Sequence, residues 1–521
     1  MFYSRIFLFL IVSVLGWTKT YNVVTATPNT NTQTTPNSRT IYSLNMNLND
    51  NNQAFLVANL VGTDIYPYSA QVLKSSNGAA SWTAFHELGY SVTPIISSPV
   101  AINNQGNGII AYTSCLYEET SLCISTMEAS GGGSFVEIDR TSDGTFSSLY
   151  VSMSDDSQKA IVSWILTEND TSTLYRSCGH MQEILPRRYR WVWEDKQEIL
   201  SGNIGSAQCA LNNNDLAFVA FIQDNCLYSM KSIDAGQSWG SPTAISLEGV
   251  AACPLIMMNN NDAVALIFTR ANGPLTAVAS SAYINGAWQS VNIISNPDET
   301  VDQFMAYMNH QNQVLVAYIY CNACVACINS LDGGMSFFAP QILYQGTAIN
   351  NLCVDLNNVN AQGNALGVVS FCCVASGSVM ASYTLNAGMT YARPAAMASN
   401  VNVNGDLALN NDGNIVMAVV NSTASALRDA VTTATASLFS IDVNSQQTKL
   451  LLQRDNVTKL QGTKIDYATR YNVYSGSGNL LFSDNTLSAD LHAQIADNQN
   501  YTITWVDALG NESLPIPISY P

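Results

Sequence analysis

The chain has 521 residues, of which 47% are hydrophobic and only 11% charged, and 38 acidic against 20 basic side chains give a formal net charge of −18. This charge repels phosphate backbones, so the composition argues against a general nucleic-acid-binding role. The length suffices for roughly three or four domains, but all-β folds often use more residues for one domain, so internal repeats must decide the domain count.

The N-terminus has the features of a secretory signal peptide. Arg5 precedes the apolar run "IFLFLIVSVLGW" at residues 6–17, which is too short to span a bilayer. We expect the peptide to occupy residues 1–20, with cleavage after Gly16 or as late as Ala26, and the polar residues 21–40 to form a linker. Export by this peptide predicts a secreted or cell-envelope protein, and no later run is apolar enough for a membrane helix.

A short apolar run recurs eight times and predicts one strand in each repeat. The copies are 47 to 57 residues apart and begin at Ala54, Gly108, Lys159, Leu216, Ala263, Gln313, Ala365 and Asn414. Turns rich in Asn and Asp precede them, such as "LNNND", and another apolar run lies upstream of each turn. Because Asn, Asp and Gly tolerate positive φ, these turns are expected to close hairpins.

A second motif, "SIDAGQSW" at residues 232–239, falls at the same place in successive repeats. Copies or worn copies begin at Ser75, Glu128, Ser232, Ser281, Ser330, Thr384 and Ser440, and the third repeat, near Trp191, has lost the motif. The motif supplies the turn between two further strands. Four strands in roughly 50 residues, repeated, are typical of the blades of a β-propeller.

These motifs resemble the Asp-box (BNR) repeat of β-propellers in the sialidase-like superfamily, over roughly residues 40–450. The resemblance implies that the box closes the turn between the third and fourth strands of a blade. Its acidic side chain would accept hydrogen bonds from turn N–H groups, its glycine would adopt positive φ, and its aromatic ring would pack between sheets. We therefore predict structural rather than catalytic roles for Asn77, Trp82, Asp234, Gly236, Trp239, Asp332, Gly334, Phe337, Asn386, Gly388 and Tyr391.

The repeats predict an all-β chain with a propeller over residues 41–450. Eight repeats imply eight blades, or seven if the terminal repeat supplies strands that close the first blade. Residues 455–521 contain no further repeat. The pieces "YNVYSGSGNLLFS" and "NYTITWVDALGNESLPIPI" resemble the later strands of a fibronectin type III domain, and the alternative is a β-sandwich fragment docked on the propeller.

Twelve cysteines in an exported chain favour disulfides over free thiols. Cys115 and Cys123 flank one predicted hairpin, which makes them a candidate pair, and Cys321 and Cys327 flank the equivalent hairpin of the sixth repeat. A zinc site there lacks a fourth ligand, since His310 is the only histidine near in sequence. No metal and no cofactor are expected.

The enzymatic features that the resemblance would imply are missing. Sialidases of this superfamily use three arginines, an Arg-Ile-Pro motif, a Tyr/Glu pair and an acid/base Asp. This chain has no Arg-Ile-Pro, and no flanking motif supports Arg39, Arg140, Arg270 or Arg393 as substitutes. The sequence therefore assigns no catalytic residue.

One cluster of basic and aromatic residues is the best ligand-binding candidate. It contains Arg187, Arg188, Arg190, Trp191 and Trp193. Guanidinium groups pair with carboxylate or sulfate, and tryptophan stacks on sugars. The alternative is a long hairpin whose arginines are solvated or pair with nearby carboxylates. With this cluster, the sequence predicts a non-enzymatic recognition propeller for glycan or protein ligands on a cell surface, and the alternative is a sialidase-like glycoside hydrolase acting on surface glycans.

Overall fold

The computed structural model describes residues 31–34, residues 40–421 apart from short gaps, residues 435–442, and the strands between 451 and 519. The chain divides into two compact units, one of which is Ala26–Ile441, while the other contains Asp442–Pro521. The predicted signal peptide lies outside the described residues. In the part of the chain that the structure describes, no helix is long and apolar enough to cross a membrane.

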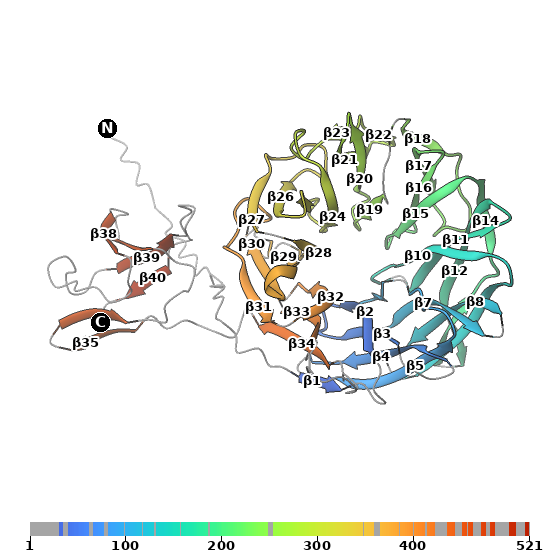
Figure 1. Ribbon diagram of the computed structural model, residues 1–521, viewed down its shortest axis with the longest axis horizontal. Helices are drawn as coiled ribbons and strands as arrows, with labels where there is room; N and C mark the ends of the chain where they lie inside the picture. Colours follow the sequence, from blue (N-terminus) through green and yellow to red (C-terminus); the bar gives the residue numbers. More distant parts are fainter. Residues whose placement is uncertain are drawn as a thin grey trace, which may run out of the picture. The chain divides into compact units, whose positions relative to one another are not determined.

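The larger unit is a ring of antiparallel sheets arranged like the blades of a propeller (Figure 1). Its described residues form eight such sheets, numbered here in chain order as blades 1 to 8. The innermost strands are β2 (Thr40–Leu48), β6 (Ala101–Ile102), β10 (Thr145–Met153), β15 (Ile204–Leu211), β19 (Leu255–Met258), β24 (Val301–Met308), β28 (Ile349–Leu356) and β32 (Val401–Leu409). The second strands are β3 (Ala54–Val61), β7 (Gly108–Leu116), β11 (Lys159–Glu168), β16 (Ala217–Gln223), β20 (Val264–Asn272), β25 (Val314–Tyr320), β29 (Gly367–Cys373) and β33 (Asn414–Asn421).

The outer half of each blade is built in the same order. The third strands are β4 (Tyr68–Ser75), β8 (Glu119–Met127), β12 (Thr171–Leu185), β17 (Cys226–Ser232), β21 (Leu275–Ile284), β26 (Cys324–Ser330), β30 (Ser378–Thr384) and β34 (Thr435–Asp442). The outermost strands are β5 (Thr83–Ser91), β9 (Gly133–Thr141), β13 (Arg188–Trp193) with β14 (Gln197–Gly202), β18 (Thr243–Ser246), β22 (Ala287–Trp288) with β23 (Asn292–Ile293), β27 (Gln341–Gln345), β31 (Ala395–Ser399) and β1 (Asn31–Thr34). The prediction of an all-β chain of four-stranded sheets is confirmed, and the eight apolar runs form the second strands. One short 3-10 turn, Val374–Ser376, is the single helical segment among the described residues.

The eighth blade is completed by the N-terminal part of the unit. Strand β1 pairs with β34 as the outermost strand of that blade. The prediction that residues 21–40 form only a linker is therefore corrected at Asn31–Thr34. The N-terminal strand completes the last blade, whereas the sequence suggested that C-terminal strands could complete the first. The sequence of β1, "NTQT", shows no apolar alternation. An outermost strand can be held through its backbone ladder alone, which explains why the hydrophobic pattern did not reveal it.

The hydrophobic core lies between neighbouring blades. Leu44 and Leu56 of blade 1 share one buried cluster with Val416 and Ala418 of blade 8, so apolar packing also joins the last blade to the first. The box aromatics occupy equivalent interfaces: Trp82 belongs to this cluster, Trp239 packs on the clusters between blades 3 and 4, Phe337 on that between blades 5 and 6, and Tyr391 on that between blades 6 and 7. Each buried large side chain stabilises the fold by about 1.5–3 kcal/mol relative to exposure.

The box residues close the turns between third and fourth strands. In blade 4, Asp234 Oδ1 accepts the backbone N–H of Ser238 at 2.9 Å, and Ser232 Oγ accepts that of Gly236 at 2.9 Å. Ala235 and Gly236 have φ of 58° and 84°, a region where glycine is favoured. Burial alone would raise the pKa of Asp234, but hydrogen bonds from Ser232 and Ser238 outweigh it and hold the pKa at about 2. The same bonds recur around Asp332 and, with an amide in place of the acid, around Asn386; the Asn77 turn keeps the bonds to Ser75.

The second unit contains two sheets among its described strands. β35 (Leu451–Asp455) pairs with β36 (Val457–Gln461). The other sheet has the order β38 (Leu480–Asp484), β37 (Arg470–Ser475), β39 (Asn500–Val506) and β40 (Ile516–Ser519), and all of its pairs are antiparallel. This confirms β structure in residues 455–521.

Candidate functional site at the centre of the ring

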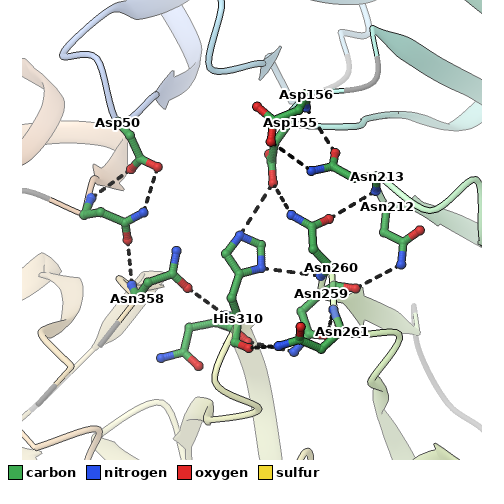
Figure 2. Close-up of polar contacts among 12 residues, drawn as sticks. Asp50, Asp155, Asp156, Asn212, Asn213, Asn259, Asn260, Asn261, His310 and Asn358 are labelled. Atoms are coloured by element: carbon green, nitrogen blue, oxygen red, sulfur yellow. Dashed lines mark hydrogen bonds and ion pairs between the residues drawn. The ribbon is translucent and has the colours of Figure 1, made fainter. Parts of the chain in front are cut away.

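The turns between first and second strands gather around the centre of the ring, and we call them the turn ring (Figure 2). Their first residues are all buried: Asn49, Asn103, Ser154, Asn212, Asn259, Asn309, Asn357 and Asn410. A buried amide is stable only when both its oxygen and its nitrogen are hydrogen-bonded. The hydrogen bonds of these amides run within their own turns and to the turns of neighbouring blades.

Six of these seven asparagines reach the next blade through Nδ2; the exception is Asn103, whose Nδ2 has no hydrogen-bond partner among the described residues. Asn259 Oδ1 accepts the N–H groups of Asn261 and Ala263 at 3.0 and 3.1 Å, and its Nδ2 donates to the carbonyl of Asn309 at 3.1 Å. The equivalent bonds to the next blade run from Asn49 to Asn103, Asn212 to Asn259, Asn309 to Asn357, Asn357 to Asn410, and Asn410 to Asn49. The last of these closes the circle between blades 8 and 1.

A second layer is formed by the next residue of each turn. Backbone N–H groups donate to the side chain of the following blade: Asn213 to Asn260 at 3.1 Å, Asn260 to His310 Nδ1 at 3.4 Å, His310 to Asn358 at 2.7 Å, Asn358 to Asn411 at 2.7 Å, and Asn411 to Asp50 at 3.0 Å. Side-chain oxygens and amides therefore line the centre in a continuous series (Figure 2).

Asp155 of blade 3 contacts this layer in blades 5 and 6. Its Oδ2 accepts Nδ2 of Asn260 at 3.0 Å and lies 3.5 Å from Nε2 of His310 (Figure 2). Since Nδ1 of His310 accepts the N–H of Asn260, Nε2 carries the proton and faces the carboxylate. The hydrogen bond to Asp155 raises the pKa of His310 above its ordinary value against the opposing effect of burial, and the charges of Asp50 and Asp156 add to it.

Two further carboxylates lie on the innermost strands: Asp355 is buried and Asp406 is half-buried. Asp355 on β28 accepts the N–H groups of Leu356 and, from blade 8, Leu409, at 2.8 and 2.7 Å. Asp406 on β32 accepts those of Leu407 and, from blade 1, Met46, at 2.8 and 2.6 Å. Burial raises the pKa of Asp355 to about 7 and that of Asp406 to about 6. Both side chains therefore bridge neighbouring blades through backbone N–H groups.

Tyr307 on β24 shows that these acids share one region. The charge of Asp355, then burial, and then the charges of Asp155 and Asp50 raise the pKa of its phenol well above the ordinary value. The side chain is nevertheless 42% exposed, so solvent reaches the centre of the ring. The region is acidic, rich in hydroxyls and amides, and was missed at the sequence level because its members come from blades far apart in the chain.

The basic cluster predicted to bind a ligand is a long hairpin of β12 and β13. Trp191 is 3% exposed and stacks on Trp193, with ring centroids 5.9 Å apart, and both pack on the core between blades 2 and 3. Only glycine fits opposite Trp193, because a Cβ on Gly179 would lie 2.8 Å from the indole. The structure therefore places Trp191 away from any ligand surface, which corrects its predicted role. Arg190 is exposed, the side chain of Arg188 and all of Arg187 lie outside the described residues, and ligand binding by these arginines stays a prediction.

The predicted disulfide pairs are corrected by strand register. In the β7–β8 hairpin Cys115 is opposite Thr120 and Cys123 is opposite Tyr112, so the two cysteines are three positions out of step. Cys327 is opposite Ala317, while Cys321 lies in the turn beyond Tyr320. Disulfides need Cα atoms within about 7 Å, which these registers do not provide. Eleven cysteines lie in the described residues, and all are free thiols there.

No metal site is formed by the described residues, since no three His, Cys, Asp or Glu side chains converge as ligands. The cysteines Cys321, Cys324 and Cys327 therefore do not make a zinc site there. The acids at the centre of the ring are held by backbone and amide donors instead.

No family model and no curated protein matches the chain. Among solved structures it is similar to a protein of unknown function from Dyadobacter fermentans, with 10% identity and a TM-score of 0.35 over 58% of this chain and 96% of the other. It is also similar to an alpha-L-arabinofuranosidase from Fusarium graminearum, with 9% identity and a TM-score of 0.33 over 76% and 92% of the two chains. A fucoside-bound lectin from Aleuria aurantia has 12% identity and a TM-score of 0.35 over 59% and 96%. Similarity at this level does not transfer a function.

Proposed function

We propose that this chain is an exported, non-enzymatic recognition propeller that binds a hydroxyl-rich ligand, a glycan or a polar protein segment, at the centre of the turn ring. The observation that carries the proposal is the charge of the innermost strands. Within the described residues these eight strands contain no arginine and no lysine, whereas Asp302, Asp355 and Asp406 lie on them.

The described arginines lie elsewhere in the blades. Arg140 is on the outermost strand β9 and pairs with Glu119 and Glu137, and Arg176 is buried on β12. Arg270 is on the second strand β20. Binding of a substrate carboxylate as in sialidases needs three arginines around one point. The positions of the described arginines do not support such a site.

The turn ring suits a neutral, hydroxylated ligand better. Asn213, Asn260 and Asn358 each offer an amide donor and an acceptor, and Asp155 offers a charged acceptor. Hydrogen bonds to a charged group are worth about 1.5–3 kcal/mol each. A sugar hydroxyl can both donate and accept, so it can replace contacts within such a series without leaving a buried group unpaired.

The test is a glycan array probed with the wild-type chain, a His310→Ala variant and a His86→Ala control. His86 is exposed on the outermost strand β5 of blade 1. We expect the wild type and the control to retain the same glycans and His310→Ala to lose about tenfold or more in affinity. Equal retention by all three proteins, or no retained glycan, would refute the proposed site.

A glycoside hydrolase is the second candidate, because Asp355 and Asp406 have raised pKa values suited to acid–base chemistry. Against it, both oxygens of each carboxylate already accept backbone N–H groups. A panel of fluorogenic glycosides that includes a sialoside separates the two functions. Turnover that disappears in Asp355→Asn would favour the hydrolase.

We further propose that residues 455–521 form a fibronectin type III-like module and that the chain is secreted. The antiparallel order β38, β37, β39, β40 supports the module, and an experimental structure with a second sheet packed on this one tests it. N-terminal sequencing of protein from secreting cells tests export. A mature chain starting between residues 17 and 27 is expected, and an intact Met1 on cell-retained protein would contradict it.

A further inference from the structure

A pocket of about 370 Å³ lies between blades 4 and 5, beside the turn ring but outside its centre. Its lining includes Asn214, Lys231, Ile233, Asp262, Tyr283 and Asn285. Asn214 and Asp262 come from the outer parts of two turns of the turn ring, Lys231 and Ile233 from the end of β17, and Tyr283 and Asn285 from the β21–β22 hairpin. The volume is sufficient for one sugar ring, at the lower end of the range for ligand pockets.

Lys231 provides the positive charge of this pocket. The other described lysines of the ring donate to strong acceptors: Lys159 to Asp215 at 2.6 Å, Lys196 to Asp139, and Lys74 to the carbonyl of Ala129 at 3.0 Å. Among the described residues, the oxygen contact of Lys231 is the hydroxyl of Tyr283 at 3.5 Å, and its ammonium lies 5.3 Å from the centroid of the Tyr283 ring. Its charge is therefore available to an anionic group that enters the pocket.

The side chains that hold Lys231 are fixed by packing. Tyr283 makes edge contacts with Phe218 at 4.9 Å and Trp288 at 5.4 Å. These rings belong to the core between blades 4 and 5, so the position of the phenol does not depend on a ligand. A site built on packed elements is preorganised, and binding then costs less conformational entropy.

The rest of the lining suits hydroxyl groups and a carbon ring. Asp262 is exposed, and its Oδ1 accepts amide hydrogens of Asn212 and Asn214 at 2.7 and 3.0 Å, which orients the carboxylate. Asn285 is exposed at the hairpin turn, and Ile233 is 77% exposed beside it. The lining therefore offers one cation, one carboxylate acceptor, amides and an apolar contact.

We propose that this pocket binds a sugar that carries a carboxylate. The sugar carboxylate pairs with the Lys231 ammonium, its hydroxyl groups donate to Asp262 and contact Asn214, and its C–H face lies on Ile233. The acid in the lining disfavours a second negative charge on the ligand, so one carboxylate per sugar is expected. This site does not depend on what the centre of the turn ring binds.

The test titrates the full chain with methyl glucuronide and with methyl glucoside, which differ in the carboxylate. We expect the uronide to bind about tenfold more tightly than the glucoside, because one charge-assisted bond distinguishes them. Lys231→Met should remove this preference, Lys231→Arg should keep it, and Asn285→Asp should weaken uronide binding through like charge. Lys74→Met, which removes a lysine of blade 1 that donates to backbone carbonyls, is the matched control and should change nothing.

The proposal would be overturned by equal affinity for both sugars or by a preference that survives in Lys231→Met. It would also be overturned by no uronide binding at about 10 mM, since a weak single-sugar site has a Kd of about 1 mM. His310→Ala should leave uronide binding unchanged, and Lys231→Met should leave array binding at the turn ring unchanged. Failure of one site is therefore distinguishable from failure of the other.

Discussion

Blade 3 differs from blades 4, 6 and 7 at both of its turns on the side of the turn ring. Those blades begin the inner turn with a buried asparagine and close the outer turn with a box. Blade 3 has Ser154 in the inner turn and the long β12–β13 hairpin in the outer one. Asn103 begins the inner turn of the neighbouring blade 2. It is buried, and its Nδ2 is unpaired among the described residues.

Blade 3 replaces the lost contacts with larger side chains. Arg176 is 2% exposed and donates to Glu194 at 2.9 Å, to Gln197 at 2.6 Å, and to the carbonyl of Gln237 in the blade 4 box. Trp191 fills the space between blades, as box aromatics do elsewhere. In this irregular blade, Asp155 reaches Asn260 of blade 5 and His310 of blade 6. An irregular blade can therefore be structurally complete and still supply a side chain that bridges other blades.

The largest effects are expected from the two tryptophans that fill equivalent interfaces. Trp239→Ala in blade 4 and Trp191→Ala in blade 3 should each lower the free energy of unfolding by about 3–5 kcal/mol, because each leaves a cavity between sheets. Chemical denaturation measures both. A cost near zero for Trp191→Ala would show that its ring is not part of the core.

The buried arginine distinguishes blade 3 from a regular blade. Arg176→Met should cost roughly 3 kcal/mol, since it leaves Glu194 without its buried partner. Arg140→Met is the control: its pairs with Glu119 and Glu137 are exposed, so a change within about 1 kcal/mol is expected. Equal losses in the two variants would remove the structural role assigned to Arg176.

The box itself is tested by Asp234→Ala. Loss of the acceptor for the Ser238 N–H and hydroxyl should cost about 1–3 kcal/mol without changing ligand binding by the folded protein. Melting temperature and array binding are measured on the same sample. A variant that melts normally but no longer binds would make the box a functional site and contradict the account.

The smallest effect on stability is expected from the tip of the blade 3 hairpin. Replacing Arg187, Arg188 and Arg190 together with glutamine should change stability by less than about 1 kcal/mol, because exposed charges contribute little. If these arginines bind an acidic ligand, the same variant should weaken that binding, most strongly at low salt. Unchanged binding of acidic glycans by the triple variant would remove the last role predicted for the cluster.

Local signals in the sequence were sufficient for the blades. The second strands are short apolar runs, and the box turns depend on residues within eight positions of one another, such as Ser232 and Trp239. The closing strand β1 was missed because its polar sequence lacks the alternation of a buried strand. The pairing of Cys115 with Cys123 was wrong because hairpin register, which spacing alone does not reveal, sets the two residues apart.

The centre of the ring depends on long-range proximity. Asp155, His310 and Asp355 come from blades 3, 6 and 7, and each looks in the sequence like an ordinary turn or strand residue. These residues come together only because the ring closes. The hydrogen bond from Asn410 of blade 8 to Asn49 of blade 1 is part of that closure. The available signal was the absence of basic residues from every innermost strand.

The central claim is that Asp155 of blade 3 and His310 of blade 6 meet across the turn ring, and a histidine NMR titration tests it most directly. The raised pKa means that His310 adds stability below its unfolded pKa of about 6.5 and that this stability is lost as pH rises through the folded pKa. The His310 signal, assigned by its loss in His310→Ala, should titrate above about 6.5 in the wild type and lower in Asp155→Asn. The same midpoint in both proteins would contradict the account.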